Sequence, residues 1–587
     1  MTLFNFSFLN SKPVIVSTDP LHSTFRLPIT YVPSDKLHQL SPLVSSDLEL
    51  ATTMYDHLLK PTHVFGKNLI CEWNKQFTTH VPFLEDSQKV LHNMPLYLEQ
   101  IAGSEAKCDS IITIWKDTKQ DVGFLEKYSY IEWDELRHLN ESSTFLQTVS
   151  VINMTSPILS FIIPLIFLIF PFILLKIQGV PIGFTTYIDV LKDIARHHFI
   201  GSMINNLQSI SWNKLIYFGF TIGLYFLQIY QNYNLCIKFY KNIHTINSHL
   251  YELRDFLAHS MLSMETFIQL NSHLPTYAGF IETTRAHCDT LRKFSDELEQ
   301  IKPFAPGLSK VVEIGYLLKC FYKLHSVPEY ENSLKYSIGF EGFINNLTGI
   351  SQNLESKHIA LAKFVRDDSK CHMKQQYYPA YVGEKHVKNN YDSSKNIVIT
   401  GPNASGKTTI LKSTTINIIF SQQFGTGFYS ECTMNPYTHI HSYLNIPDTS
   451  GRDSLFQAES RRCKEIIDSI NATEEHNSRH FCIFDELYSG TNPTEATQSA
   501  HAFLMYLSKR NNVQFLLTTH YISLCKKLKA SSQIQNYMMM VESSDAFKTI
   551  KYNYKMKKGI SKVKGGILIL EEMNYPCEII DTIRNNL

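Results

Sequence analysis

The run Asn396-Ile-Val-Ile-Thr-Gly-Pro-Asn-Ala-Ser-Gly-Lys-Thr408 decides the fold of the C-terminal part of this chain. Its first five residues read as a buried strand, and Gly401–Thr408 fits the pattern GxxxxGK[ST]. That pattern indicates a phosphate-binding loop only where it follows a strand and precedes a helix. The segment Thr409–Phe420 is predicted to form the helix. The sequence therefore predicts a phosphate-binding P-loop in a parallel α/β sheet.

The residues of this loop predict a nucleotide site. Its glycines let backbone amides turn toward phosphate oxygens, and Lys407 is expected to reach the β- and γ-phosphates. The Thr408 hydroxyl is expected to bind Mg²⁺ at the start of a helix whose dipole favours anions. With ATP and Mg²⁺ as ligands, the predicted binding residues are Gly401, Pro402, Asn403, Ala404, Ser405, Gly406, Lys407, Thr408 and Thr409.

Two further apolar strands end in polar residues. Phe481–Phe484 is followed by Asp485 and Glu486, the Walker B arrangement. In that arrangement the aspartate holds Mg²⁺, and the glutamate positions the attacking water or acts as the base. A solvated turn is the alternative for two adjacent carboxylates. The strand at 514–517 is followed by Thr518-Thr519-His520, which places an imidazole where it can sense a γ-phosphate. The predicted catalytic residues are Lys407, Glu486 and His520.

The order and spacing of these motifs resemble the ATPase domain of the MutS family. The segments that carry the resemblance are TGPNASGKTTILKS at Thr400–Ser413, FDELYSGTNPTEA at Phe484–Ala496 and TTHY at Thr518–Tyr521. The tail Tyr554–Asp581 is similar to the family's tail, and the resemblance covers about Tyr377 to the C-terminus. It implies an ATPase with two composite ATP sites in a homodimer, or in a heterodimer with a related chain.

The resemblance also implies roles for single residues. Gly451–Glu459 is similar to the family's signature loop, so Ser454 would be donated to the γ-phosphate of the partner. Asn403 matches the family's P-loop asparagine, and Glu486 matches its hydrolytic glutamate. The chain departs from the family at Ser405, at Thr408 and in Tyr488–Thr491, and the phosphate chemistry is expected to survive these changes. Three residues stay open as the adenine-stacking group: His386, Val387 and Tyr554.

Helical patterns precede the ATPase section, which we place at residues 371–587. His63–Asn93 resembles the start of the family's helical core, and residues 244–305 carry apolar residues at helical spacing. We expect residues 46–150 to form the first half of the core and 238–370 to form the returning lever. The lead of residues 1–45 is too short for mismatch-reading and connector domains.

Two uncharged apolar runs interrupt this helical region. Ile158–Leu175 reads ILSFIIPLIFLIFPFILL, and Leu215–Ile237 is bracketed by Lys214 and Lys238. Their lengths predict two transmembrane helices, at about 156–176 and 215–237, within a hairpin of residues 151–237. A pair of buried core helices is the alternative, although such helices tend to have shorter apolar runs. The expected fold is thus an all-α core and lever interrupted by two transmembrane helices, followed by a P-loop NTPase domain with an ABC/MutS-type parallel sheet.

The orientation of this hairpin follows from the nucleotide site. Basic residues lie both in the loop of the hairpin and on its outer flanks, so the positive-inside rule does not decide its orientation in the membrane. ATP is a cytosolic or nuclear substrate, and both ends of a two-span hairpin lie on one side. The ATPase domain of a membrane-bound protein is therefore expected to face the cytosol or nucleoplasm. Met1–Asn10 lacks the basic and apolar regions of a signal peptide.

Composition narrows the function classes. The 587 residues contain 55 Lys+Arg and 54 Asp+Glu, so nucleic-acid binding would need a local basic patch. Eleven cysteines occur without a CxxC pair or a Cys/His cluster at zinc spacing, which favours a reducing compartment and no structural metal. Basic residues that could contact phosphates, or simply be solvated, are Lys526, Lys527, Lys529, Lys557, Lys558, Lys562 and Lys564.

Together these features predict a membrane-tethered, MutS-like dimeric ATPase. ATP binding would clamp two C-terminal domains together and hydrolysis would release them, on mismatched or branched DNA in repair or recombination. The alternative is a membrane-anchored module that uses the same dimerisation on a protein or membrane partner without binding DNA. A transporter would need more spans than two per chain. DNA affinity that falls steeply with salt separates the first function from the second.

Overall fold

The computed structural model groups the chain into two compact units. One comprises Met1–Asp19, Glu105–His259 and Thr290–Asn332, and the other comprises Pro20–Ser104, Ser260–Asp289 and Ser333–Leu587. The described residues are 21–179, 183, 185–189, 212–304, 308–366, 371–446, 454–473, 478–544, 549–561, 563, 567, 570–571, 573 and 575–585. The first part of the predicted lead, most of the loop between the apolar runs and Gly451–Asp453 of the signature loop lie outside them. The predicted five-part division of the chain stays a prediction.

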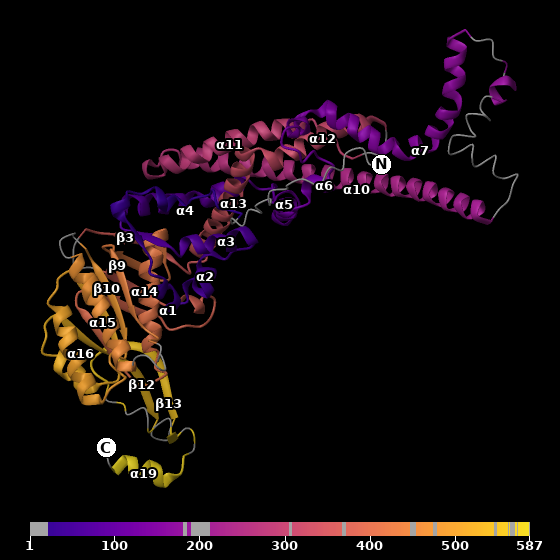
Figure 1. Ribbon diagram of the computed structural model, residues 1–587. Helices are drawn as coiled ribbons and strands as arrows, with labels where there is room; N and C mark the ends of the chain where they lie inside the picture. Colours follow the sequence, from indigo (N-terminus) through magenta and orange to yellow (C-terminus); the bar gives the residue numbers. More distant parts are fainter. Residues whose placement is uncertain are drawn as a thin grey trace. The chain divides into compact units, whose positions relative to one another are not determined.

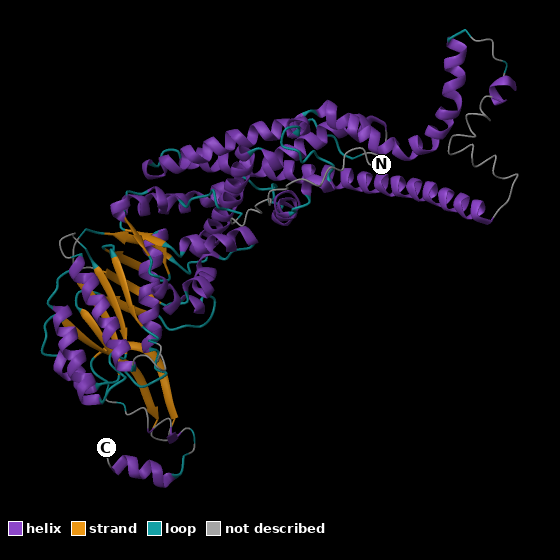
Figure 2. Cartoon of the chain, viewed as in Figure 1, coloured by secondary structure: helices purple, strands orange, loops and turns teal. Residues whose placement is uncertain are grey.

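The second unit contains a six-stranded sheet with the order β13-β12-β6-β11-β10-β9 (Figures 1 and 2). Five of its strands run parallel, and only β13 pairs antiparallel, with β12. The strands are β6 Asn396–Thr400, β9 His439–Tyr443, β10 His480–Asp485, β11 Val513–Thr519, β12 Ile534–Ser544 and β13 Thr549–Lys558. The predicted mixed α/β class of the C-terminal part is confirmed.

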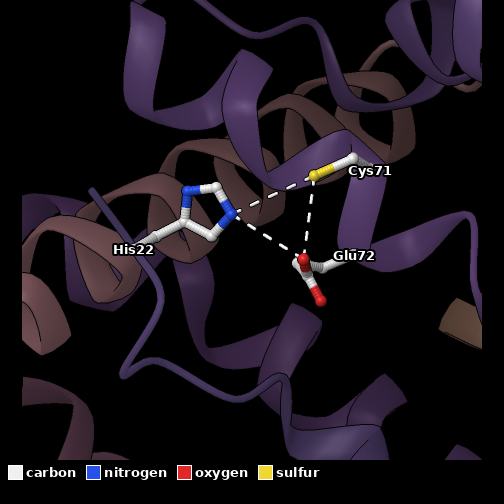
Figure 3. Close-up of side chains that lie close together, drawn as sticks. All are labelled: His22, Cys71 and Glu72. Carbon is white, nitrogen blue, oxygen red and sulfur yellow. Dashed lines mark hydrogen bonds and ion pairs between the residues drawn. The ribbon is translucent and has the colours of Figure 1, made fainter. Parts of the chain in front are cut away.

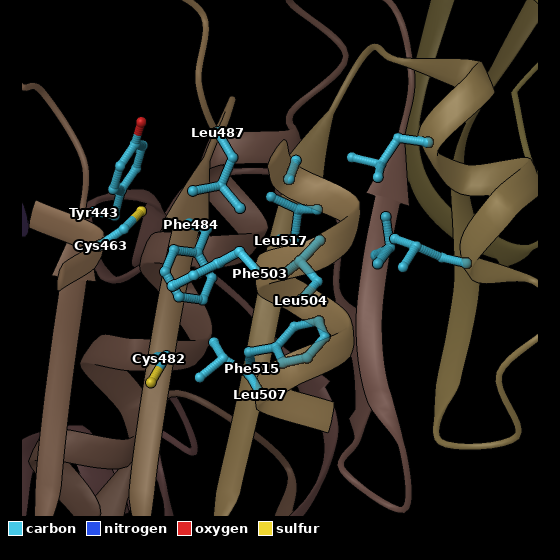
Figure 4. Packing of buried hydrophobic residues seen from close by; sticks show 14 of the residues in the cluster. Tyr443, Cys463, Cys482, Phe484, Leu487, Phe503, Leu504, Leu507, Phe515 and Leu517 are labelled. Carbon is cyan, nitrogen blue, oxygen red and sulfur yellow. The ribbon is translucent and has the colours of Figure 1, made fainter. Parts of the chain in front are cut away.

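Helices cover both faces of this sheet, which explains why its central strands are apolar on both sides. On one face, side chains of α15 (Leu455–Ala472), α16 (Pro493–Ser508) and α17 (Ile522–Leu528) pack with Phe484, Phe515 and Leu517 of the strands (Figure 4). The opposite face carries α14 (Lys407–Phe424), which contacts β10 and β11 (Figure 1). This double cover buries the central strands on both faces.

A second sheet, with the order β5-β4-β8-β3-β7, accompanies the first. Its strands are β3 Ala360–Phe364, β4 Cys371–Gln376, β5 Asn389–Asp392, β7 Thr426–Gly427 and β8 Glu431–Met434. The buried Gln376 donates from Nε2 to Thr414 Oγ1 at 2.7 Å, which links β4 to α14. The P-loop helix is therefore held by both sheets.

The N-terminal helical residues of this unit pack directly on the ATPase segment. Gln423, in the last turn of α14, accepts from the Tyr55 hydroxyl at 2.9 Å and donates to Trp73 O at 2.7 Å. These contacts are buried, so their loss would leave polar groups unpaired. The elements involved are β1 Leu37–Gln39, α1 Pro42–Asp47, α2 Tyr55–Leu59, α3 Val64–Trp73, β2 Gln76–Thr78 and α4 Val81–Gln100.

The first unit is helical. Its helix α7 (Ser143–Ile177) is fixed to α12 (Leu308–Ser326) through Gln147, which donates to Val311 O at 2.6 Å and accepts from Gly315 N at 2.8 Å. The short helices are α5 Cys108–Trp115 and α6 Phe124–Lys127. Three long helices contribute to both units: α10 Trp212–Asn271, α11 Ala278–Glu299 and α13 Pro328–Glu355.

The two apolar runs lie in α7 and α10 and pack against each other. Ser160 O accepts from the Tyr225 hydroxyl at 3.0 Å, and Ser160 Oγ accepts from Asn232 Nδ2 at 2.6 Å. Among the described residues, one helix segment, Ser143–Ile162, is long and apolar enough to cross a membrane. It begins before the predicted span at 156–176.

The prediction of two transmembrane helices is therefore not confirmed. The second run loses apolar character at its end, where Gln228, Gln231, Asn232 and Asn234 follow the apolar stretch Leu215–Leu227. Asn232 instead provides a polar contact to α7.

Candidate nucleotide-binding site

The predicted site residues gather at one edge of the large sheet. Strand β11 lies between β6 and β10, and all three run parallel, with Thr400 opposite Thr519 and Asp485 opposite Thr518. Their carboxyl ends therefore meet at the same edge. This register brings the P-loop after β6, the acidic pair at the end of β10 and His520 after β11 to one place, at a switch point of the kind where open α/β sheets bind ligands.

The P-loop has the backbone that a phosphate cradle needs. Ala404 and Gly406 have φ angles of 63° and 90°. Helix α14 starts at Lys407 without a side-chain cap, so its first amides are available to an anion. Ser405, which stands where the family has glycine, is buried, and its Oγ donates to Pro402 O at 2.7 Å. The serine side chain thus folds back into its own loop. This placement is compatible with the expectation that the loop can bind phosphate without a glycine at this position.

The magnesium ligands predicted from sequence lie in contact. Thr408 Oγ1 donates to Asp485 Oδ2 at 2.9 Å, and the other carboxylate oxygen accepts from the Thr518 hydroxyl. Hydroxyl and carboxylate oxygens are ligands that Mg²⁺ accepts, so the donor set fits this ion. The contact of Thr518 with Asp485 was not predicted. The register between β10 and β11 would have revealed this contact, because Asp485 and Thr518 lie directly opposite each other.

Lys407 lies inside the loop with only 6% of its surface exposed. Its Nζ donates to Gly401 O at 3.0 Å and to Pro402 O at 3.2 Å. Burial lowers the pKa of Lys407, while the carboxylates of Glu486 and Asp485 act in the opposite direction. A buried ammonium beside carbonyl oxygens is well placed to pair with phosphate charge.

Glu486 and His520 form a pair at the open side of the edge. The imidazole Nδ1 of His520 lies 3.2 Å from Glu486 Oε1, and both side chains are partly exposed. This hydrogen bond from His520 lowers the pKa of Glu486 against the effect of burial, with smaller contributions from the charges of His520 and Lys407. The glutamate is therefore ionised at neutral pH, as a base must be. His520 thus contacts the Glu486 carboxylate, and its role as a γ-phosphate sensor stays a prediction.

Other predicted residues lie around this centre. Asn403 and Ala404 are exposed at the tip of the P-loop, and Thr409 O accepts from Ser413 Oγ at 2.6 Å within α14. Ser454 is exposed and caps α15, where its Oγ accepts from Gln457 N at 3.3 Å. The structure thus brings Lys407, Thr408, Asp485, Glu486 and His520 together and leaves Ser454 exposed at the start of α15.

The three adenine candidates differ in their surroundings. His386 is stacked on Tyr377 with ring centroids 4.0 Å apart, and Val387 is exposed. Tyr554 lies against the P-loop, because a Cβ added to Gly406 would meet its ring at 3.2 Å. Its ring is also partly exposed and its φ is 52°, a strained backbone that its neighbours must hold. Tyr554 thus lies beside the P-loop, and which of the three residues stacks on adenine stays open.

The candidate DNA-contacting lysines are only partly described. Lys526 and Lys527 lie in the last turn of α17, Lys529 follows that helix, and Lys557 and Lys558 end β13. Lys562 and Lys564 lie outside the described residues.

Glu459 is a residue whose role the sequence did not reveal. It is buried on α15 and accepts from Ser489 N at 3.0 Å, from Ser489 Oγ at 2.8 Å and from Gly490 N at 3.2 Å. It thereby fixes the loop that directly follows the acidic pair of β10.

Replacement of Glu459 by glutamine is expected to destabilise the domain by about 1–3 kcal/mol, because an amide nitrogen would face backbone donors. Denaturant unfolding of the full chain measures the effect. Glu465→Gln on the same helix, where the exposed carboxylate pairs with Arg462, is the matched control and should change stability little. Equal effects of the two substitutions would contradict a structural role for Glu459.

Comparison with known proteins identifies the same region. Residues 397–587 match the family model of MutS domain V. DNA mismatch repair protein MutS of Listeria welshimeri is 24% identical over 330 residues, which cover 52% of this chain and 37% of that protein. The MutS of Persephonella marina is 24% identical over 221 residues, covering 37% and 25%, and that of Bacteroides fragilis is 25% identical over 244 residues, covering 39% and 27%. The chain thus spans well under half the length of these curated relatives. It is similar to MutS proteins, and its C-terminal third matches the model of MutS domain V.

Proposed function

We propose that this chain is a MutS-like ATPase that binds and hydrolyses ATP with Mg²⁺ and acts on mismatched or branched DNA as a homodimer or a heterodimer. The observation that carries the proposal is the joint placement of two pairs at one sheet edge. Thr408 contacts Asp485 at 2.9 Å, and Glu486 contacts His520 at 3.2 Å. The domain V match over residues 397–587 supports it independently.

Each residue of the edge has a distinct part in this reaction. The free amides at the start of α14 and the ammonium of Lys407 bind the phosphates. Thr408 and Asp485 would hold Mg²⁺, whose charge would neutralise that of the phosphates. Glu486 orients the attacking water and accepts its proton, while the hydrogen bond from His520 fixes the carboxylate. Thr518 orients Asp485 through its second oxygen.

The proposed dimer would complete the site with Ser454. Its exposed position at the start of α15 supports donation to a partner's nucleotide. A helix start also favours a phosphate group. Ser454→Ala is the direct variant for this arrangement.

DNA binding is the part of the proposal taken from the relatives, whose printed names describe mismatch repair. Its test is fluorescence anisotropy of the detergent-solubilised full chain with perfect, mismatched and branched duplexes over a salt series. We expect the logarithm of the DNA-binding constant to fall linearly with the logarithm of the salt concentration, because phosphate contacts release counterions. Absence of binding at low salt would overturn DNA binding and leave an ATPase whose partner is a protein or a membrane.

We also propose that the chain is tethered to a membrane through α7 and α10, with the ATPase domain facing the cytosol or nucleoplasm. Large apolar side chains stay exposed along both helices, as is typical of a lipid-facing surface. Those described include Ile158, Phe161, Ile166, Ile169, Phe170, Ile216, Phe220, Phe226 and Leu227. Flotation with phospholipid vesicles at high salt tests the tether. A chain that stays in the dense fraction would contradict it.

A further inference from the structure

Three potential metal ligands converge outside the nucleotide site. His22 lies in a turn that precedes the helical core, and Cys71 and Glu72 are consecutive on α3 (Figure 3). The Nε2 of His22 lies 4.0 Å from Cys71 Sγ and 3.8 Å from Glu72 Oε1, and Cys71 Sγ lies 3.7 Å from Glu72 Oε1. All three belong to the unit that contains the ATPase segment.

Cys71 Sγ makes weak hydrogen bonds to the other two groups, and all three separations are also close to those of ligands around one ion. Tetrahedral zinc with ordinary bond lengths holds N, O and S ligands about 3.3–3.6 Å apart. The three donor atoms are therefore within about half an ångström of that arrangement. The imidazole and the carboxylate are too far apart for a direct hydrogen bond. A small closure of side chains would complete a three-ligand site.

The Cys71 thiol donates to Asn68 O at 2.9 Å, so its hydrogen has a partner within α3. Coordination by this sulfur would have to displace the thiol proton, because the thiolate is the form that binds metals.

Lys75 holds the carboxylate in place. Its Nζ lies 2.7 Å from Oε1 and 2.8 Å from Oε2 of Glu72. One oxygen can turn to a cation while the other keeps the ammonium, a supporting contact of the kind that orients metal ligands. A cation bound here would weaken the ion pair between Lys75 and Glu72, so its binding free energy must offset that loss.

We propose that His22, Cys71 and Glu72 form a zinc-binding site with one coordination position left to water. Imidazole and thiolate ligands select a borderline-soft divalent cation such as Zn²⁺ over Mg²⁺. The site is unrelated to the ATP reaction and goes beyond the proposed function. Sequence spacing does not show it, because His22 and Cys71 are separated by 49 positions and meet only in the fold.

The site would fasten the N-terminal segment to the helical core. Phe25 packs against Phe280 and Tyr336, with ring centroids 5.9 Å and 5.3 Å apart. A Cβ added to Gly339 would meet Phe25 Cβ at 2.2 Å, so the segment lies directly on α13. An ion bound three residues before Phe25 would hold this packing and stabilise the fold.

The test is a zinc titration of the metal-stripped full chain against a chromogenic chelator, with excess Mg²⁺ to occupy the ATP site. We expect one zinc per chain and at least tenfold weaker binding in Cys71→Ser and in His22→Gln. Cys577→Ser removes the other exposed cysteine and should leave binding unchanged. Equal affinity in the wild type and both ligand variants would overturn the proposal and indicate adventitious binding to other histidines.

Cobalt substitution separates coordination from a folding defect. The cobalt-loaded wild type should show a thiolate-to-cobalt charge-transfer band that Cys71→Ser lacks and Cys577→Ser keeps. Thermal unfolding of the metal-stripped proteins shows whether Cys71→Ser still folds. Zinc should raise the unfolding temperature of the wild type and not that of Cys71→Ser. A band that persists in Cys71→Ser would contradict the ligand assignment.

Discussion

Replacement of Glu486 by glutamine is expected to lower the rate of ATP hydrolysis by about 100-fold or more while ATP binding persists. The amide keeps the shape of the side chain but cannot accept the proton of water. The proposed nucleotide contacts, by contrast, come from the P-loop and from Asp485, which accepts a hydrogen bond from Thr408. A binding assay with labelled ATP and a phosphate-release assay separate the two effects.

The matched control is Asp468→Asn, an exposed carboxylate on α15 that pairs with Lys464 and lies apart from the sheet edge. Its hydrolysis rate should equal that of the wild type. Because His520 holds Glu486, His520→Ala should lower hydrolysis less than Glu486→Gln does. A Glu486→Gln variant that hydrolyses ATP at the wild-type rate would show that another group acts as the base.

Acidification below pH 6.5 is expected to destabilise the second unit strongly, because a cluster of neutral histidines lies at the β9 edge of its large sheet. The rings of His439 and His480 have centroids 4.6 Å apart, His441 and His480 share a hydrogen bond of 3.0 Å, and His38 lies 6.3 Å from His439. Burial is the main cause that lowers their pKa values, to about 3 for His441 and His480 and to about 4 for His38.

The direction of the effect follows from proton binding. In the unfolded chain these histidines take up protons near pH 6.5, whereas the folded cluster stays neutral. Stability is therefore complete above pH 6.5 and declines as the pH falls from 6.5 toward about 3. At pH 5 each histidine that stays neutral in the folded state lowers the free energy of unfolding by about 2 kcal/mol relative to pH 8.

Denaturant unfolding between pH 8 and pH 4 measures this dependence. His439→Phe keeps an aromatic ring for stacking and removes one titrating group, so its stability should fall less steeply with acid. His273→Gln, an exposed histidine of the same unit, should leave the slope unchanged. A wild-type slope no different from that of His439→Phe would contradict the account of the cluster.

The local motifs could be predicted because their chemistry depends on residues close in sequence. Gly401–Thr408 needs only a strand before it and a helix after it, and the structure provides β6 and α14. From the sequence, Glu486 and His520 could be expected only to lie near each other. Their contact depends on β11 lying beside β10 in the sheet. Parallel strand order was sufficient to place the predicted catalytic groups at one edge.

Contacts between distant segments could not be predicted in this way. Glu459 caps a loop thirty residues later, and His22 meets α3 through a turn of the chain. Neither pairing leaves a periodic or motif-like signal. The contact between the two apolar runs could not be predicted either, since Asn232 of the second run donates to Ser160 Oγ, 72 positions earlier in the chain.

The most direct test of the central claim is phosphate release from ATP with Mg²⁺ by the full chain, alone and with perfect, mismatched and branched duplexes. Lys407→Ala, which removes the buried phosphate-binding ammonium, is the comparison. The account predicts hydrolysis that disappears in Lys407→Ala and is stimulated by DNA in the wild type at low salt. Hydrolysis that is absent from the wild type, or that survives in Lys407→Ala, would contradict it.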